Sequence, residues 1–130
     1  MGFLDIDVKG ATEPKAVSGD AEYQVRIVSI EQRINKSGNP FLFPRFDIPE
    51  EPTSKDFSKY LPLPCDGMTD KQVNNAKWGL KAFFDAFGID AGKKIDIDDC
   101  VGSTAWAILG VSEDEEYGEQ NFIKRFIKAK

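Results

Sequence analysis

Residues 26–60 combine basic and aromatic side chains in a pattern that could bind single-stranded nucleic acid. The basic residues are Arg26, Arg33, Lys36, Arg45, Lys55 and Lys59. The aromatic residues among them are Phe41, Phe43, Phe46, Phe57 and Tyr60. Lysine and arginine can follow phosphates, and each aromatic face that stacks on a base contributes about 1–3 kcal/mol. The competing interpretation is that these rings fill a protein core while the cations are only solvated.

Alternation along residues 41–48 separates the two faces of a predicted strand. One face looks like core and comprises Leu42, Phe46 and Ile48. The other face holds the exposed candidates, which are Phe41, Phe43 and Arg45. In the next predicted strand Lys59 and Tyr60 point to opposite sides, and the sequence leaves open which of them faces a groove.

The end of the sequence carries two blocks of opposite charge. Residues 113–119 hold five acidic side chains, whereas residues 120–130 hold four basic ones, among them Lys124. The basic strand could line a nucleic-acid groove while the acidic turn points away or meets a partner. A solvated hairpin with internal ion pairs is an equally good interpretation.

The two tryptophans are also candidates for a contact surface. Trp106 lies in a predicted strand, and the sequence leaves open whether its indole packs inside a barrel or lines the binding face. Trp78 lies on the polar side of a predicted helix, where an indole can mark a contact surface. More often such a side chain lies under a loop or under the N-terminal arm.

The sequence predicts five strands that position these residues. They are expected at 23–34, 41–48, 57–63, 103–111 and 121–127. A slip in the alternation between Ile27 and Val28 predicts a β-bulge in the first strand. Pro44 lacks an amide donor, so the second strand is expected at a sheet edge or with a bulge. An acidic turn is expected at residues 112–119.

One helix has the clearest signals in the chain. Thr69 and Gln72 form a capping box at its start, and Gly88 is expected to end it. Apolar residues recur with the helical period of 3.6 and predict a buried face. These residues are Val73, Ala76, Leu80, Phe83, Phe84 and Phe87.

The predicted order is three strands, one helix and two further strands. We therefore predict a mainly β fold with one helix, a five-stranded OB-fold barrel with the helix between strands 3 and 4. The alternative is an α+β sandwich in which one helix crosses an open five-stranded sheet. Residues 1–20 are predicted to form a flexible N-terminal arm, and residues 21–130 the OB-fold domain that binds single-stranded nucleic acid.

The composition argues against catalysis. The 130 residues include no histidine, which excludes histidine-based acid–base catalysis and the common zinc sites. No Gly-rich phosphate loop or nucleophile motif is present, so we expect no enzymatic activity and no cofactor. The acidic residues Asp96, Asp98 and Asp99 lack the glycine and the terminal glutamate of an EF-hand loop, so no metal site is expected.

Charge and cysteine content point to the class of protein and its compartment. The chain has 17 Lys and Arg against 22 Asp and Glu, and this net charge of −5 by itself argues against a protein that coats polyanions. Cys65 and Cys100 have no CxxC spacing and are expected to be reduced. Without a signal peptide or an apolar run of about 20 residues, the chain is expected to be cytoplasmic and not membrane-bound.

Several short motifs are spread between Gly19 and Ile127. They are KSGNP followed by FLF at 36–43, WGLKAFF at 78–84, DCVG at 99–102, Tyr117-Gly118, and Asn121. Together with the basic first strand, they resemble the phage-encoded OB-fold single-stranded DNA-binding proteins of replication and recombination gene clusters.

This resemblance implies an OB-fold and sequence-tolerant binding of single-stranded DNA in phage replication, recombination or repair, in the host cytoplasm. The residues expected to contact DNA are Arg26, Arg33, Lys36, Phe41, Phe43, Arg45, Lys59, Tyr60, Trp106 and Lys124. The expected partners are single-stranded DNA and replication or recombination enzymes. The sequence leaves open whether the protein forms a homodimer.

Two features of the sequence favour other interpretations. Many single-strand binding proteins end in an acidic tail that recruits enzymes, whereas this sequence ends with the basic residues Lys128 and Lys130. We therefore expect either that such a tail is missing from this sequence or that partners are recruited differently. The alternative function, favoured by the net charge, is an acidic protein-interaction module or DNA-mimicking inhibitor that binds a nucleic-acid enzyme.

Overall fold

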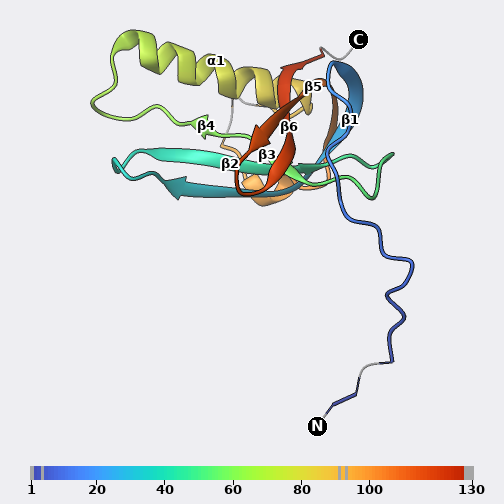
Figure 1. Cartoon of the computed structure of the whole chain (residues 1–130). Coiled ribbons are helices and arrows are strands. Elements are labelled where there is room, and N and C mark those ends of the chain that lie inside the picture. Colours follow the sequence, from blue (N-terminus) through green and yellow to red (C-terminus); the bar gives the residue numbers. More distant parts are fainter. Residues whose placement is uncertain (1, 4, 91, 93, 128–130) are drawn as a thin grey trace.

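The computed structural model describes residues 2–3, 5–90, 92 and 94–127, and this part of the chain is mainly β (Figure 1). Its strands are β1 (Ala21–Ile34), β2 (Pro40–Asp47), β3 (Phe57–Ser58), β4 (Leu61–Pro62), β5 (Thr104–Asp114) and β6 (Gly118–Phe126). The single α-helix of the described residues is α1 (Asp70–Ala86), and a short 3-10 helix, η1, covers Ile97–Cys100. The prediction of a mainly β fold with one helix after the third strand region is confirmed.

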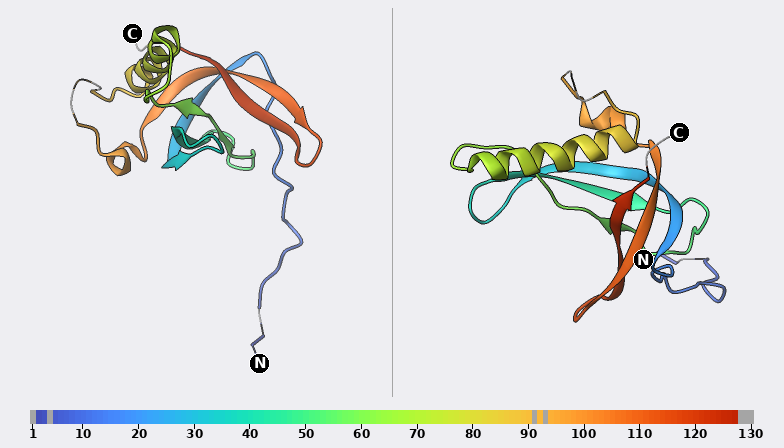
Figure 2. Two further views of the ribbon diagram at one scale, coloured as in Figure 1. Left: turned by 90° about the vertical axis from the view of Figure 1, so that its left-hand side faces the viewer. Right: turned by 90° about the horizontal axis from the view of Figure 1, so that it is seen from above.

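The strands form one antiparallel sheet in the order β3-β2-β1-β5-β6, with β4 also paired to β2. The long strand β1 pairs with β5 over Ala21–Arg26 and with β2 over Arg26–Ile34. The register shifts between Ile27 and Ser29, which confirms the predicted β-bulge. Because a bulge bends its strand, β1 can serve two differently directed parts of the sheet. Figure 2 shows this curved sheet, with the β5–β6 hairpin extending away from α1.

The predicted third strand at 57–63 is interrupted. Within this segment the short strands β3 and β4 pair with β2, and Lys59 and Tyr60 between them lie outside regular strand structure. The Lys59 amide still donates to the Pro44 carbonyl at 3.1 Å, so one backbone hydrogen bond joins the gap to β2. The interruption allows Lys59 and Tyr60 to turn to different surfaces.

The acidic turn predicted at 112–119 is wrong in extent. β5 continues to Asp114 and β6 begins at Gly118, so only residues 115–117 form the turn. The Asp114 Oδ1 atom accepts hydrogen bonds from the amides of Glu116 (2.8 Å) and Tyr117 (3.0 Å). Gly118 closes the turn with a φ of +75°, a conformation that glycine adopts at little cost. Acidic residues have low β propensity, and here the turn geometry and backbone pairing override it.

The core lies between the inner face of the sheet and α1. The capping box of Thr69 and Gln72 is present, and Gly88 follows the helix with a φ of +71°. Of the predicted helix face, four residues are buried: Ala76, Phe83, Phe84 and Phe87. Val73 and Leu80 are half-buried. Cys100 is buried and Cys65 half-buried, both as free thiols.

The predicted N-terminal arm contacts the sheet from Lys15 onward. Lys15 forms a parallel bridge with Ser54, and the amide of Asp20 donates to the Leu109 carbonyl. Asn121 is the buried polar residue of the core region, and its side chain bonds both the amide (2.8 Å) and the carbonyl (3.0 Å) of Val17. The chain before Lys15 extends away from the sheet (Figure 1). No helix in the described part is long and apolar enough to cross a membrane.

Candidate nucleic-acid interface

Aromatic side chains gather on the outer face of β2, where the alternation of the strand places them. Leu42 and Phe46 are buried beneath, whereas Phe41 and Phe43 are half-buried on the opposite face. The rings of Phe41 and Tyr60 lie 4.5 Å apart between centroids, and those of Phe41 and Phe43 lie 6.1 Å apart with an edge-on angle of 85°. The sheet register thus produces a continuous group of three outer rings.

One cation belongs to the same group. Arg33 pairs with Phe41 in the β1–β2 register, and its guanidinium carbon lies 5.1 Å from the ring centre of Phe43. We call Arg33, Phe41, Phe43 and Tyr60 the aromatic strip. A base stacks on an exposed ring or guanidinium face regardless of its identity, so such a strip suits sequence-tolerant binding.

The turn beside the aromatic strip is rigid and carries Lys36. The Asn35 Oδ1 atom accepts the amides of Ser37 (2.9 Å) and Asn39 (3.0 Å), and its Nδ2 atom donates to the Tyr60 hydroxyl (3.1 Å). Gly38 adopts a φ of +86° within the turn. Lys36 is exposed and forms no ion pair with any described residue. An unpaired cation therefore lies at one end of the strip.

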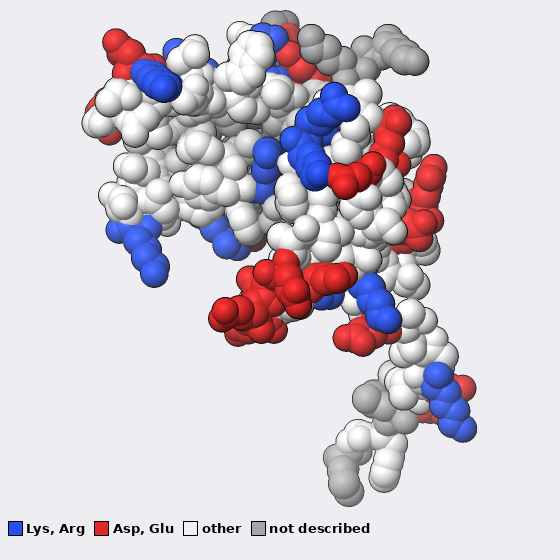
Figure 3. All heavy atoms as spheres, turned by 45° about the horizontal axis from the view of Figure 1, so that its top comes forward, with Lys and Arg blue, Asp and Glu red and all other residues white. Residues whose placement is uncertain are grey.

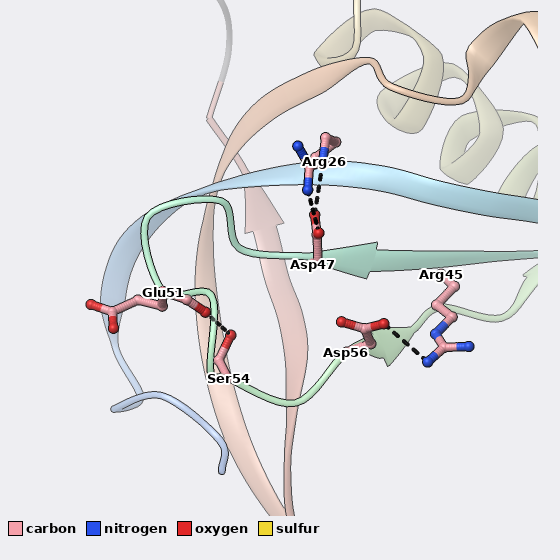
Figure 4. A network of polar contacts seen from close by, with 6 residues as sticks. All are labelled: Arg26, Arg45, Asp47, Glu51, Ser54 and Asp56. Atoms are coloured by element: carbon pink, nitrogen blue, oxygen red, sulfur yellow. Dashed lines mark hydrogen bonds and ion pairs between the residues drawn. The ribbon is translucent and has the colours of Figure 1, made fainter. Parts of the chain in front are cut away.

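The arginines of this face all have carboxylate partners. Arg26 makes a two-bond contact with Asp47, at 2.6 and 3.1 Å, and the Arg45 guanidinium lies 3.0 Å from the Asp56 carboxylate (Figure 4). Arg33 pairs with Glu31. Hydrogen bonding to Asp47 is the main cause that raises the pKa of Arg26 above its ordinary value. Exposed ion pairs of this kind contribute about 0–1 kcal/mol, so a phosphate could replace the carboxylates at low cost.

Lys59 and Lys124 lie in a different region. A cleft of about 610 Å³ opens between α1 and β6, and Lys59 reaches it from the segment between β3 and β4. Its basic lining residues are Lys59, Lys81, Lys124 and Arg125, and its larger apolar ones are Trp78, Ile123, Phe126 and Ile127. We call this the α1–β6 cleft. Since the Tyr60 ring lies against that of Phe41, it is Tyr60 and not Lys59 that belongs to the aromatic strip.

The two tryptophans are both exposed. Trp78 is 70% exposed at the cleft, so the expectation that it lies under a loop or the arm is wrong. Trp106 is 43% exposed and pairs with Gln24 of β1, on the outer side of the sheet. Arg26, two residues along β1 from Gln24, points to that same side and is exposed.

The ten predicted residues therefore fall into three groups. Arg33, Phe41, Phe43 and Tyr60 form the aromatic strip, with Lys36 and Arg45 beside it. Arg26 and Trp106 lie farther along the outer face, and Lys59 and Lys124 line the cleft. Sequence reasoning missed the carboxylates that neutralise the arginines. Of these only Glu31 carried a local signal, since it lies two residues before Arg33 on the same strand.

The acidic residues around η1 serve the local backbone. The Asp96 Oδ1 atom accepts the amide of Asp98 at 3.0 Å and so caps the short helix. Asp98 and Asp99 are exposed. Within the described ranges, no three potential ligand side chains gather where they could hold a metal ion.

A family model described as "Protein of unknown function (DUF669)" matches residues 6–127, and the chain belongs to this family. The match includes every strand, the helix and both the aromatic strip and the cleft. No curated protein matches the chain.

Proposed function

We propose that this chain is a sequence-tolerant single-stranded DNA-binding protein that acts in phage DNA replication, recombination or repair in the host cytoplasm. The observation that carries the proposal is the aromatic strip: the adjacent Phe41 and Tyr60 rings, tilted by 35°, beside Phe43 and Arg33 on the outer face of a sheet. Binding alone needs no catalytic group, so the proposed protein is not an enzyme.

The finer fold that we propose is an OB-fold barrel. Three features support it: β1 is bulged and pairs with both β2 and β5, α1 lies between β4 and β5 in the chain, and β3 comes close to β6. Closure of a barrel would require β3 and β6 to approach in this way. Oligonucleotides bind OB-folds across the second and third strands, which are β2 and β3–β4 in this chain.

The proposed mechanism combines stacking with exchange of ion pairs. Bases stack on Phe41, Phe43 and Tyr60, while phosphates take the place of Glu31 and Asp56 beside Arg33 and Arg45. A cation that only exchanges a carboxylate for a phosphate releases fewer counterions than a free cation. We therefore expect a shallow salt dependence, because stacking is not screened and Lys36 is the cation beside the aromatic strip that has no ion-pair partner among the described residues.

The test is a fluorescence anisotropy titration with labelled oligo-dT at two salt concentrations. We expect binding at micromolar protein that weakens only moderately at the higher salt concentration. Absence of binding at micromolar protein in low salt would contradict the proposal. Parallel titrations with RNA and duplex DNA of the same length determine which nucleic acid is preferred.

A second candidate function is supported by the acidic end of the β5–β6 hairpin. Its five carboxylates make no ion pair among the described residues, as in a surface that engages a basic protein. An interaction module or DNA mimic would bind no oligonucleotide, and its function would not depend on the aromatic strip. The same titration therefore separates the two candidates.

A further inference from the structure

The hairpin end formed by residues 113–119, the acidic tip, is held in one shape with its side chains outward. Asp114 fixes the turn through two backbone amides. From outside the hairpin, Lys55 Nζ donates to the carbonyl oxygens of Tyr117 (2.8 Å) and Glu119 (3.1 Å). Tyr117 itself is 62% exposed. The tip therefore presents a tyrosine ring surrounded by carboxylates on a rigid support.

The five negative charges of the acidic tip are balanced only in part, because a single cation of the described residues, Lys55, reaches the tip. Glu113 and Glu119 lie directly opposite each other in the ladder, and like charges in that position destabilise a hairpin. None of the five carboxylates pairs with a cation of the described chain, and the Lys55 ammonium that reaches the tip is bonded to backbone carbonyls. Figure 3 shows a dense acidic patch on this face, with Lys and Arg side chains at its edge. A basic surface brought against the tip would relieve the repulsion.

The α1–β6 cleft has the opposite chemistry. Its lining includes the aromatic side chains of Trp78 and Phe126 as well as its basic residues. Lys81 pairs with Asp85, and Lys124 with Asp20, whereas Lys59 and Arg125 have no ion-pair partner in the described part. At about 610 Å³ the cleft lies within the ordinary range of pockets that bind small ligands, so it can admit a tyrosine side chain.

The two surfaces lie at opposite ends of the same strand. β6 begins in the acidic tip at Gly118, and its last residues, around Phe126, line the cleft. Eight residue steps of about 3.3 Å separate these ends by roughly 26 Å. A molecule therefore cannot fill its own cleft with its own tip. A contact between copies would use two different surfaces and leave one of each free, the arrangement that produces open chains or, where the rotation closes, rings.

We propose that a second copy of this chain docks its acidic tip into the α1–β6 cleft. Tyr117 enters between Trp78 and Phe126, and the surrounding carboxylates face Lys59 and Arg125. Repetition of the contact gives head-to-tail oligomers whose stability falls as salt rises, since the attraction is between opposite charges. The inference does not depend on DNA binding, because neither surface includes the aromatic strip.

Sedimentation velocity of the full chain without DNA tests the inference. In low salt we expect the average mass to grow with protein concentration, and in high salt a return to monomer. A monomer under all conditions, or a closed dimer that does not grow further, overturns the inference. Phe41→Ala with Phe43→Ala should associate like the wild type, so loss of DNA binding and loss of association are separate outcomes.

Two complementary variants make the test specific. The tip variant carries Glu115→Lys and Glu116→Lys, and the cleft variant carries Trp78→Ala and Arg125→Ala. All four side chains are exposed, so both variants should keep the wild-type melting temperature. Each variant alone should self-associate at least about tenfold more weakly than the wild type. In the tip variant like charges meet, and in the cleft variant an aromatic side chain of the cleft is lost.

The mixture of the two variants is the decisive measurement. The intact tip of the cleft variant fits the intact cleft of the tip variant, and the remaining surfaces are both defective. An equimolar mixture should therefore form one-to-one heterodimers that do not grow. Asp5→Lys with Asp7→Lys makes the same charge change in the N-terminal arm and should associate normally. Association of either variant alone like the wild type, or a mixture that stays monomeric, overturns the inference.

Discussion

The chain uses phenylalanine in two regions with opposite consequences. Inside, Phe46 packs against Phe83 and Phe87, the latter ring nearly parallel at 5.8 Å. Outside, Phe41 and Phe43 of the same strand stay half-buried and meet Tyr60 and Arg33. The difference comes from strand alternation, which directs neighbouring residues to opposite faces. The inner rings should thus determine the stability of the fold, and the outer rings should determine the binding of DNA.

The largest expected effect is on the inner region. Phe83 is fully buried and contacts the rings of Phe46, Phe84, Phe87 and Phe126. Phe83→Ala should lower the free energy of unfolding by about 3–5 kcal/mol, because it removes apolar contacts and leaves a cavity. Urea denaturation measures this loss. A variant that loses less than about 1 kcal/mol would show that the two regions do not differ as described.

The next effect is on the outer region. Phe41→Ala should weaken oligo-dT binding by about 1–3 kcal/mol, the range expected for one lost base stack. Anisotropy titration measures the affinity, and thermal melting should show little change. Tyr60→Phe is the matched control, because it keeps the ring and removes only the hydroxyl that accepts from Asn35. A large drop in melting temperature for Phe41→Ala would assign this ring to the core instead.

A smaller effect should distinguish charge from stacking within the outer region. Lys36→Gln removes an unpaired cation, so the slope of log affinity against log salt should become shallower by about 0.7. Lys77→Gln makes the same charge change on an exposed position of α1 and should leave the slope unchanged. Equal slopes for both variants and the wild type would exclude a phosphate contact at Lys36.

The smallest effect concerns a buried thiol of the inner region. Burial, with added repulsion from Asp99 and Asp96, raises the pKa of Cys100. The folded state therefore holds this proton more tightly than the unfolded state. The stabilisation is complete below the thiol's ordinary pKa and is lost as the pH rises through the raised pKa. Urea denaturation at neutral and alkaline pH should show a steeper loss in the wild type than in Cys100→Ala. Identical pH dependence of the wild type and Cys100→Ala would contradict the raised pKa of Cys100.

Local signals predicted much of the fold. The slip at Ile27–Val28 marked the bulge that lets β1 pair on both sides, and Thr69 with Gln72 marked the start of α1. Alternation along β2 also predicted correctly which side chains lie inside, since Leu42 and Phe46 are buried. These features depend on residues close in sequence, and so a single sequence contains them.

Features that depend on distant residues could not be predicted. The partners of Arg26 and Arg45 are carboxylates brought near by strand pairing and by the loop before β3. The position of Lys59 in the α1–β6 cleft depends on how α1 packs against β6. The extent of the strands in the acidic tip depends on the distant Lys55, which donates hydrogen bonds to its carbonyls, and on the Asp114 carboxylate, which accepts the amides of the turn.

Asn121 sets a limit on how far proteases can trim the chain. Its buried amide group depends on the Val17 backbone for two of its three hydrogen bonds, and the third goes to the Gly110 carbonyl at 3.1 Å. Cleavage before Lys15 leaves this arrangement intact. Cleavage after Val17 would leave buried polar atoms without hydrogen-bond partners, at a cost of about 1–3 kcal/mol each. The smallest stable fragment therefore begins ahead of the first strand, at the segment that Asn121 binds.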